Sequence, residues 1–531
     1  MRITNKIIQN NNLSNINTNK IYQDKLSTQM STQKKINRPS DDPVVAIRAL
    51  RLRSNVTEIT QYYSKNIPDA ESWLNVTEDA LTNLSQIITS MIDQCTKGSN
   101  SPLKTEDRQI ILEQLKALGE EVYSTGDADY AGRYVFTGYR TDTSLSFDEE
   151  QTKNYTITEQ LDSSAVDSVI KVNLTHVNAD GNTESLLDIN SANFADMEID
   201  EEAITSVEVH RIRLAYDSCS DYAGTAGVSP SITYIDENGN EQTWSGFVGE
   251  GGDITLMHSY DDPYTAAAND ADAVIYVPET GEILLGENRY KTLMGTADDD
   301  TTVKNEAEIR VTYEKSSWQK GDLRPEHYFY CESDPRTDDS VVYNKSYLTE
   351  NVERQDIEYD VGFNQTIRVN STADQCFQHG IGREVDDLVN AMQDVLDLEA
   401  VQANIENMMK TVEEGSAAEA TLQNQLDAVN KALTYAKNKE QTLFERGITT
   451  FQGYLDDASL CITECGTRSS KLSLIKNRTQ NQKTTFETLK SGNEDIDITE
   501  VVIQLTSAEL TYDAALMATG KVSQTTLLNY I

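Results

Sequence analysis

Cysteine and histidine are the side chains of this sequence with the widest chemical range, because both bind metals and both act in nucleophilic catalysis. The chain has six cysteines and five histidines, and the histidines are isolated from one another. The closest cysteine pair, Cys461-x-x-x-Cys465, lies in helix-like sequence with no histidine nearby. A structural zinc site normally takes four ligands from such clusters. The spacing therefore predicts free thiols at Cys95, Cys219, Cys331, Cys376, Cys461 and Cys465.

Carboxylates give a second set of candidates. Asp236-x-Asn238-x-Asn240 resembles the opening of a calcium loop, but Gly239 is misplaced and the twelfth position is Phe247 instead of Glu. A hairpin turn is the interpretation that this pattern favours. The runs Asp261-Asp262 and Asp298-Asp299-Asp300 have no neighbouring His, Cys or Lys in an acid–base arrangement, which indicates solvated loops.

No phosphate-binding loop, dinucleotide fingerprint or nucleophile elbow occurs in the sequence. We therefore predict no enzyme, no catalytic residues, no cofactor and no metal site. Aromatic residues in the middle of the chain leave two interpretations open. They pack a core, or they line a glycan-binding groove: Trp244, Trp318, Tyr328, Phe329 and Tyr330.

The formal net charge of −42 is distributed unevenly. Residues 1–147 hold 17 acidic and 17 basic residues, residues 148–355 hold 43 and 14, and residues 356–531 hold 27 and 14. An acidic middle suits a solvated outer surface, and the absence of a basic stripe argues against a nucleic-acid partner. No run of 18 apolar residues predicts a membrane span, and residues 1–19 lack the apolar core of a signal peptide.

The two ends of the chain carry apolar stripes that need a partner. In the last stretch the steps alternate between four and three, which predicts one narrow helical stripe of Val501, Leu505, Ala508, Tyr512, Ala515, Thr519 and Val522. Seven Asn residues between positions 5 and 19 lower helix propensity, so the N-terminal segment should be helical only when a partner buries its apolar side. Two interpretations stay open: a coiled coil joining the termini of one chain, or contacts between copies.

The candidate contacts between copies are Ile3, Ile7, Leu13, Ile16, Val501, Leu505, Tyr512, Leu516, Leu527, Leu528 and Ile531.

Long helices are expected between these ends and the middle. Asp42-Pro43 is a strong helix start, since Asp caps the first turn and Pro loses no hydrogen bond there. Pro68 should kink or break that helix. Further helices are predicted over residues 104–125, 383–414 and 421–489. The last would be about 100 Å long at ~1.5 Å per residue, and it must pack along residues 42–97 to be stable.

The middle of the chain changes to short strands. Strands are predicted at residues 155–158, 169–174 and 232–235, with hairpins turning at residues 236–239 and 278–281 and another over residues 359–370. The predicted fold is α+β, a helical bundle built from both termini with a β-rich insertion. The expected domains are terminal helices (1–40 and 495–531), a bundle (41–147 and 356–494) and an acidic β-rich outer domain (148–355) that should be separable from the bundle.

Four segments resemble the flagellin family, and within it the hook–filament junction proteins. They are the MRIT start, Arg38-Pro39-Ser40-Asp41-Asp42-Pro43, residues 132–139 (GRYVFTGY) and the Leu527-Leu528-Asn529-Tyr530-Ile531 end. Pro43-Val44-Val45 stands where flagellin has Ala-Ala-Gly, as in the junction proteins. The resemblance covers residues 1–147 and 356–531, and six cysteines are a departure from a cysteine-poor family.

The resemblance implies an elongated flagellin-like helical bundle and a structural subunit of the bacterial flagellum, an adaptor at the hook–filament junction. Its terminal helices would form the core of a homo-oligomeric ring beside a neighbouring hook-associated protein and flagellin. The C-terminal segment would also bind an export chaperone. The implied location is extracellular, reached through the flagellar channel without a cleaved signal peptide. The alternatives are a flagellin-type filament subunit and a surface adhesin on a coiled-coil stalk.

Overall fold

The computed structural model describes residues 5–100, 103–177, 183–197, 199–222, 229–235, 240–294, 309–335, 337, 339–349 and 354–524. The chain divides into two compact units. Unit 1 comprises Met1–Glu71, Glu358–Ile367 and Ser469–Ile531, and unit 2 comprises Ser72–Ile357 and Arg368–Arg468. The three-domain division expected from the sequence stays a prediction.

Helices form most of both ends of the chain. They are α1 (Asn5–Thr32), α2 (Pro43–Gln61), α3 (Ile67–Ser99), α4 (Thr105–Gly126), α5 (Pro263–Asn269), α6 (Glu287–Met294), α7 (Ala373–Cys376), α8 (Gly380–Met409), α9 (Ala417–Glu494) and α10 (Ile498–Gln524). The helices predicted over residues 104–125, 383–414 and 421–489 are confirmed as α4, α8 and α9.

Strands occupy the middle of the chain and the return to its helices. They are β1 (Asp129–Tyr130), β2 (Arg133–Tyr134), β3 (Gln151–Leu161), β4 (Val166–Asn173), β5 (Thr175–Val177), β6 (Thr183–Ser185), β7 (Thr205–Arg213), β8 (Ser231–Ile235), β9 (Glu241–Ser245), β10 (Thr255–Leu256), β11 (Val274–Val277), β12 (Glu282–Leu285), β13 (Ile309–Trp318), β14 (Tyr330–Ser333), β15 (Val341–Tyr343), β16 (Glu358–Gly362) and β17 (Gln365–Arg368). The α+β fold, with helices from both termini and a β-rich middle, is confirmed.

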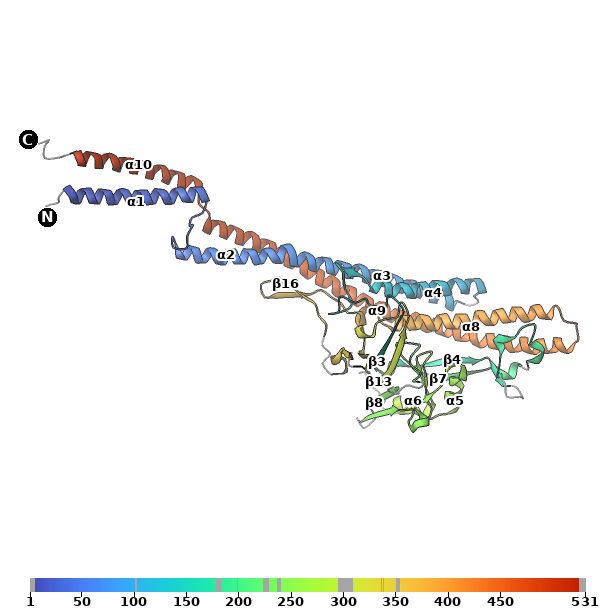
Figure 1. Ribbon diagram of the computed structural model, residues 1–531. Coiled ribbons are helices and arrows are strands. Elements are labelled where there is room, and N and C mark those ends of the chain that lie inside the picture. Colours follow the sequence, from blue (N-terminus) through green and yellow to red (C-terminus); the bar gives the residue numbers. More distant parts are fainter. Residues whose placement is uncertain are drawn as a thin grey trace, which may run out of the picture. The chain divides into compact units, whose positions relative to one another are not determined.

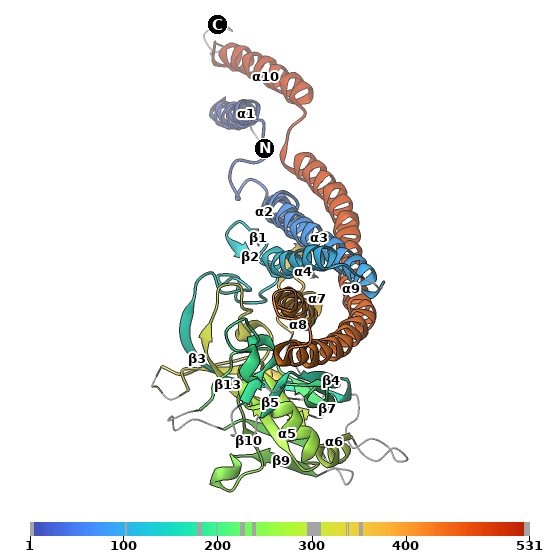
Figure 2. The ribbon, with the colours of Figure 1, turned by 90° about the vertical axis from the view of Figure 1, so that its right-hand side faces the viewer.

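In unit 1, helices α1 and α10 lie side by side (Figure 1 and Figure 2), with the start of α1 and the end of α10 at the same end of the pair. The start of α2 is as predicted: Asp42 Oδ1 accepts hydrogen bonds from the amides of Val44 (3.0 Å) and Val45 (3.1 Å). Near Pro68 the expected interruption takes the form of one π-helical turn, Tyr62–Asn66, placed directly before α3. The hairpin of β16 and β17 contacts this turn, where Phe363 meets Tyr62 edge to face at 5.8 Å between ring centroids.

The long helix α9 packs along α2 and α3 as predicted. In unit 1 the Lys476 ammonium contacts Glu71 at 2.6 Å. In unit 2 the ring of Phe444 fills the space above Gly98, and a Cβ there would lie 2.5 Å from the ring. Glycine at this position therefore lets α3 and α9 approach closely, because no larger residue leaves room for the Phe444 ring.

Unit 2 holds two larger sheets. One has the strand order β10-β11-β12-β7-β4 and the other β15-β14-β3-β13-β8-β9. The hairpins predicted around residues 236–239 and 278–281 are confirmed by the antiparallel pairs β8–β9 and β11–β12, although residues 236–239 themselves lie outside the described part of the chain. The longest pairing, β13 with β3, joins segments far apart in sequence.

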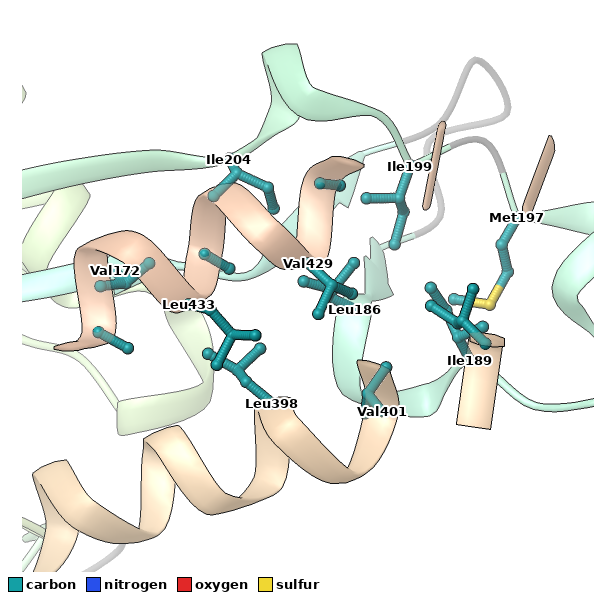
Figure 3. Close-up of a cluster of buried hydrophobic side chains, with 14 of the residues drawn as sticks. Val172, Leu186, Ile189, Met197, Ile199, Ile204, Leu398, Val401, Val429 and Leu433 are labelled. Carbon is teal, nitrogen blue, oxygen red and sulfur yellow. The ribbon is translucent and has the colours of Figure 1, made fainter. Parts of the chain in front are cut away.

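A hydrophobic cluster joins the β-rich segment to the helices of unit 2 (Figure 3). Side chains from β4 and from the turns between β6 and β7 contribute Val172, Leu186, Ile189, Met197, Ile199 and Ile204. They pack against the facing sides of α8 and α9, which contribute Val395, Leu398, Val401, Ile405, Met408, Leu422, Ala428, Val429, Ala432, Leu433 and Ala436. We call this set the insert–bundle core. It shows that the β-rich segment shares a core with α8 and α9, the helices that follow it in the chain.

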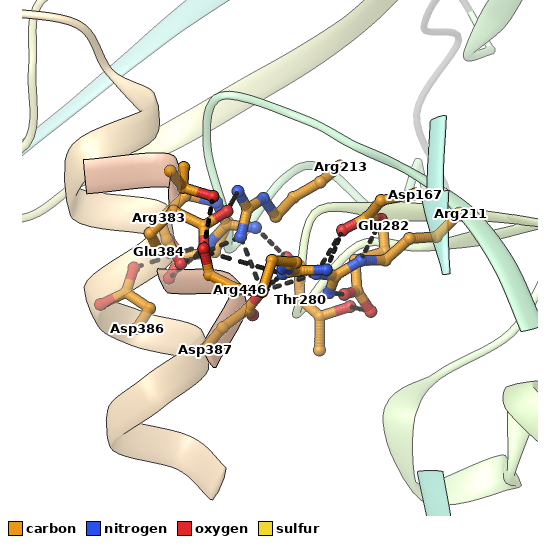
Figure 4. A network of polar contacts seen from close by, with 12 residues as sticks. Asp167, Arg211, Arg213, Thr280, Glu282, Arg383, Glu384, Asp386, Asp387 and Arg446 are labelled. Carbon is orange, nitrogen blue, oxygen red and sulfur yellow. Dashed lines mark hydrogen bonds and ion pairs between the residues drawn. The ribbon is translucent and has the colours of Figure 1, made fainter. Parts of the chain in front are cut away.

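A network of buried charges links β4, β7 and β12 to α8 and α9 (Figure 4). The Arg211 guanidinium, 2% exposed, contacts the carboxylates of Asp167 at 2.8 Å, Asp387 at 2.5 Å and also Glu282. Arg213 contacts Asp387 and Glu384, each at 2.6 Å. Burial opposes ionisation of Asp387, but Arg211 and Arg213 outweigh it and hold the pKa of this carboxyl well below its usual range.

The aromatic residues considered for a binding groove are core residues. Trp244, Trp318, Tyr328 and Phe329 are buried, and Tyr330 is half-buried. The indole of Trp318 packs against Phe147 and Tyr155 at 4.9 and 5.3 Å between ring centroids. The Tyr328 hydroxyl donates to the Phe377 carbonyl at 2.7 Å. These contacts favour the core-packing interpretation.

Candidate assembly site at the paired terminal helices

Helices α1 and α10 run antiparallel, and the stripe predicted on α10 faces α1. Val501 and Ala508 are buried together with Leu26 of α1, and Leu505 packs against this cluster. Further along the pair the Tyr22 hydroxyl donates to Gln504 Oε1 at 3.4 Å. Tyr512, Ala515 and Thr519 are half-buried, so the steps of four and three continue as one seam.

The contact surface of α1 in this seam is more polar than that of α10. Its inward positions are Ile8, Gln9, Asn12, Ile16, Asn19, Gln23 and Leu26. The Asn-rich stretch is therefore helical beside a partner, as the sequence predicts. A seam with so few apolar contacts on one side contributes little stability by itself, because area burial supplies most of the free energy of such pairs.

Hydrogen bonds and ion pairs connect the helix pair to the rest of unit 1 where α1 ends and α10 begins. The Arg53 guanidinium donates two parallel hydrogen bonds to the Glu494 carboxylate, each 2.7 Å, and the Glu494 side chain is 3% exposed. The Lys35 amide donates to the Glu494 carbonyl at 2.8 Å, and the Ile496 amide donates to the Gln33 carbonyl at 3.2 Å. The bond to Glu494 raises the pKa of Arg53, and the bond from Lys34 lowers the pKa of Asp495.

The candidate contacts between copies fall into three groups. Val501, Leu505, Tyr512 and Ile16 belong to the seam within the chain, whereas Ile7, Leu13 and Leu516 are exposed. Ile3, Leu527, Leu528 and Ile531 lie outside the described residues. The role of all of them in assembly stays a prediction. Among the candidates that the structure describes, the first group is brought together inside one chain.

A second apolar row on α10 was not predicted from the sequence. Ile503, Leu510 and Met517 are 65%, 73% and 73% exposed. They follow one another at intervals of seven residues, which places them on one side of the helix, away from the seam. We call these three residues the outer row. The seven-residue repeat of the outer row is visible in the sequence. The stripe with alternating steps of four and three is longer, and it alone was predicted as a helix contact.

Exposed apolar side chains also occur on α1, at Ile7, Leu13, Ile21, Tyr22 and Met30. Single exposed apolar residues are normal, but two helices that each expose several suggest an unpaired association surface. Among the described residues, no group of three or more His, Cys, Asp or Glu could hold a metal ion. Within the same part of the chain, no helix is long and apolar enough to cross a membrane.

Comparison with known proteins agrees with the resemblance seen in the sequence. Residues 3–141 match the bacterial flagellin N-terminal helical region. This part of the chain is flagellin-like. It includes α1 to α4 and the turn that follows them. The resemblance to the flagellin family is confirmed.

Two curated relatives are flagellar hook-associated protein 3. The protein from Salmonella typhimurium is 28% identical over 169 residues, which cover 31% of this chain and 52% of that protein. The protein from Escherichia coli is 28% identical over 154 residues, which cover 29% and 48%. The chain thus spans about half the length of these relatives. A solved flagellar hook-associated protein 3 from Legionella pneumophila is 11% identical, covering 83% of this chain and 97% of that one, with a TM-score of 0.29.

Proposed function

We propose that this chain is a structural subunit of the bacterial flagellum, an adaptor at the hook–filament junction that self-associates through its terminal helices. The observation that carries the proposal is the flagellin-type N-terminal region in a chain similar to hook-associated protein 3 of two bacteria. The domain roles follow: residues 1–40 and 495–531 form the polymer core, residues 41–147 and 356–494 the bundle around it, and residues 148–355 the outer domain.

The terminal pair supports self-association because it keeps apolar surface on its outer side. The outer row on α10 and the exposed apolar residues of α1 would pack against other copies in a ring. Residues 1–147 have no net charge, so close packing of many copies meets little repulsion there. The seam residues then act within each subunit, and the outer row between subunits.

The proposal includes partners and a location. The ring would contact a neighbouring hook-associated protein on one side and flagellin on the other, with no nucleic acid and no membrane as partners. The C-terminal segment would bind an export chaperone before assembly. The subunit would reach the extracellular flagellum through the flagellar channel without a cleaved signal peptide, and it would have no catalytic activity.

Deletion of the gene from its own bacterium tests this function. We expect cells without filaments and monomeric flagellin in the medium, because filament subunits then have no junction to build on. Re-expressed epitope-tagged chain should give immunogold label only at the boundary between hook and filament. Filaments that remain attached after deletion would contradict the junction role.

A filament subunit is the second candidate, since a flagellin from Clostridium tyrobutyricum is 28% identical over 122 residues, 23% of this chain and 32% of that protein. Label distributed along the whole filament would support it instead of the junction role. The adhesin alternative loses its support, because four of its five candidate groove residues are buried in the core.

A further inference from the structure

Two cysteines from segments far apart in sequence meet in unit 2. Cys376 ends the short helix α7, and Cys461 lies in the middle of α9. Cys461 Sγ donates a hydrogen bond to the carbonyl oxygen of Gln375, the residue before Cys376, at 3.5 Å. The two thiols are close enough that each changes the pKa of the other. Both residues are free thiols.

The segment around Cys376 is held firmly against α9, which keeps the two thiols together. Gln378 Nε2 donates to Asp457 Oδ2 at 2.7 Å, one helical turn before Cys461. On the other side, Arg468 Nη1 donates to the Asn370 carbonyl at 2.9 Å and to Ser371 Oγ at 3.1 Å. These bonds hold the segment against α9 on both sides of the cysteine pair, and two cysteines held close together can form a disulfide with little backbone rearrangement.

We propose that Cys376 and Cys461 form an oxidisable dithiol that closes to an intramolecular disulfide when the folded chain meets a low-molecular-weight disulfide. The proposal goes beyond the junction function and does not rest on it. Reducing cytoplasm would keep the pair as thiols, and an oxidising environment would close it.

The two thiols have different parts in the reaction. The neighbouring Cys376 thiol lowers the pKa of Cys461, which is also the more exposed of the two, at 8% against 2%. The Cys461 thiolate would attack one sulfur of the small disulfide, so that its S–S bond breaks and one thiolate leaves. Cys376 then loses its proton and attacks the Cys461 sulfur, which releases the second thiolate. Two electrons pass to the small disulfide, and the two released thiolates take up the two protons.

The other cysteines contact different segments of the chain and supply controls. Cys465 Sγ donates to the Leu74 carbonyl at 3.5 Å, and Cys219 Sγ donates to the Tyr216 carbonyl at 3.3 Å. Cys331 is fully buried on β14. A disulfide specific to the dithiol should therefore survive Cys331→Ala and be lost in Cys376→Ala or Cys461→Ala.

The test is made on the purified, folded full chain. The chain is incubated with oxidised glutathione at pH 8, blocked with N-ethylmaleimide and only then unfolded and digested without reductant. We expect mass spectrometry to find a peptide pair joining Cys376 to Cys461 and the count of free thiols to fall from six to four. Since the bridge encloses α8 and half of α9, the melting temperature should rise by a few degrees and return after reduction.

In the Cys376→Ala chain the same treatment should leave glutathione attached to Cys461 with no internal bridge. The cross-linked peptide is measured on the unaltered chain, so the outcome does not depend on whether a variant folds. Six remaining thiols, a Cys461–Cys465 bridge, or glutathione retained on Cys461 of the unaltered chain would each overturn the proposal.

Discussion

At the scale of single residues, Glu159 is a carboxyl that the structure buries completely near the end of β3. Its Oε1 accepts hydrogen bonds from the Ala215 amide at 2.9 Å and from the Tyr313 hydroxyl. Burial raises the pKa of Glu159 to about 7, although these hydrogen bonds act in the opposite direction. The folded chain therefore binds a proton at this site more tightly than the unfolded chain does.

This binding predicts how stability changes with pH. Because the folded pKa is raised, the contribution of Glu159 is fully present below the unfolded pKa of about 4.5 and is lost as pH rises through about 7. Glu159→Gln stays neutral, so its free energy of unfolding relative to the original chain should increase by about 3 kcal/mol between pH 5 and pH 8. Urea unfolding at several pH values measures this, with the exposed Glu208→Gln as control. Parallel pH profiles for the Glu159→Gln variant and the original chain would contradict it.

Arg211 carries a second prediction at this scale. Its guanidinium contacts three carboxylates in a buried network, so Arg211→Met removes the ion-pair partner of Glu282 and leaves Asp167 and Asp387 with fewer cationic contacts. Breaking a buried ion pair from one side typically costs roughly 3–5 kcal/mol. We expect a loss of that size in thermal or urea unfolding of the variant. Lys291→Met, which removes an exposed pair with Glu287, should change stability by less than about 0.5 kcal/mol. Equal effects in both variants would show that the network is not what stabilises unit 2.

At the scale of elements, the two faces of α10 should respond differently to the same substitution. Val501→Asp places a charge in the seam beside Leu26 and Ala508. This should destabilise the packing of α1 against α10 by roughly 2–4 kcal/mol, which is enough to separate a weakly paired helix. We expect faster amide exchange along α1 and α10 of the monomer. Leu510→Asp lies in the outer row and should leave monomer exchange unchanged.

Substitutions in the outer row should leave the monomer intact but prevent assembly. Leu510→Asp combined with Met517→Asp would place charges between subunits and prevent polymer formation, as seen by electron microscopy of the assembled protein. Secretion of the variant is measured separately, because the same segment is proposed to bind the export chaperone. Normal polymers from the double variant would exclude the outer row as the contact between copies.

Sequence patterns predicted most of the elements because the signals for these elements are local. The Asp42 cap, the hairpins around residues 236–239 and 278–281 and the length of α9 each depend on a few neighbouring residues. The stripe on α10 was also found, but a stripe does not say which partner covers it. In the structure, α1 of the same chain covers the stripe. The outer row is therefore the face of α10 that stays exposed, which the sequence alone did not indicate.

Features that depend on distant segments could not be predicted. Glu159 and Arg211 lie in strands where charges resemble a solvated face, and only the pairing of β3 with β13 and of β7 with β12 buries them. Likewise, Cys376 and Cys461 become a pair only when α7 is placed on α9. The contributors to the insert–bundle core between residues 186 and 204 come from irregular turns, which have no periodicity to read.

At the scale of the whole molecule, that core changes what removal of the β-rich segment should do. The charge distribution suggested that residues 148–355 could be replaced by a short Gly/Ser connection without harm to the bundle. In the structure, this excision would uncover apolar side chains of α8 and α9 such as Leu398, Val401 and Val429. Exposed apolar surface of this kind promotes aggregation and lowers stability. We expect the excised chain to bind a hydrophobic dye and to melt with reduced cooperativity.

Two neighbouring residues test the same contact in the intact chain. Leu186 is fully buried in the insert–bundle core, whereas Leu187 beside it is 41% exposed. Leu186→Asp buries an unpaired charge against α8 and α9 and should lower the free energy of unfolding by several kcal/mol, about 3 or more, while Leu187→Asp should change it by less than about 0.5 kcal/mol. Both variants keep the net charge equal, so urea unfolding compares burial alone. If the excised chain stays soluble with a cooperative helical transition and Leu186→Asp melts like Leu187→Asp, the β-rich segment is an independent module, and the helices of unit 2 do not need its cover.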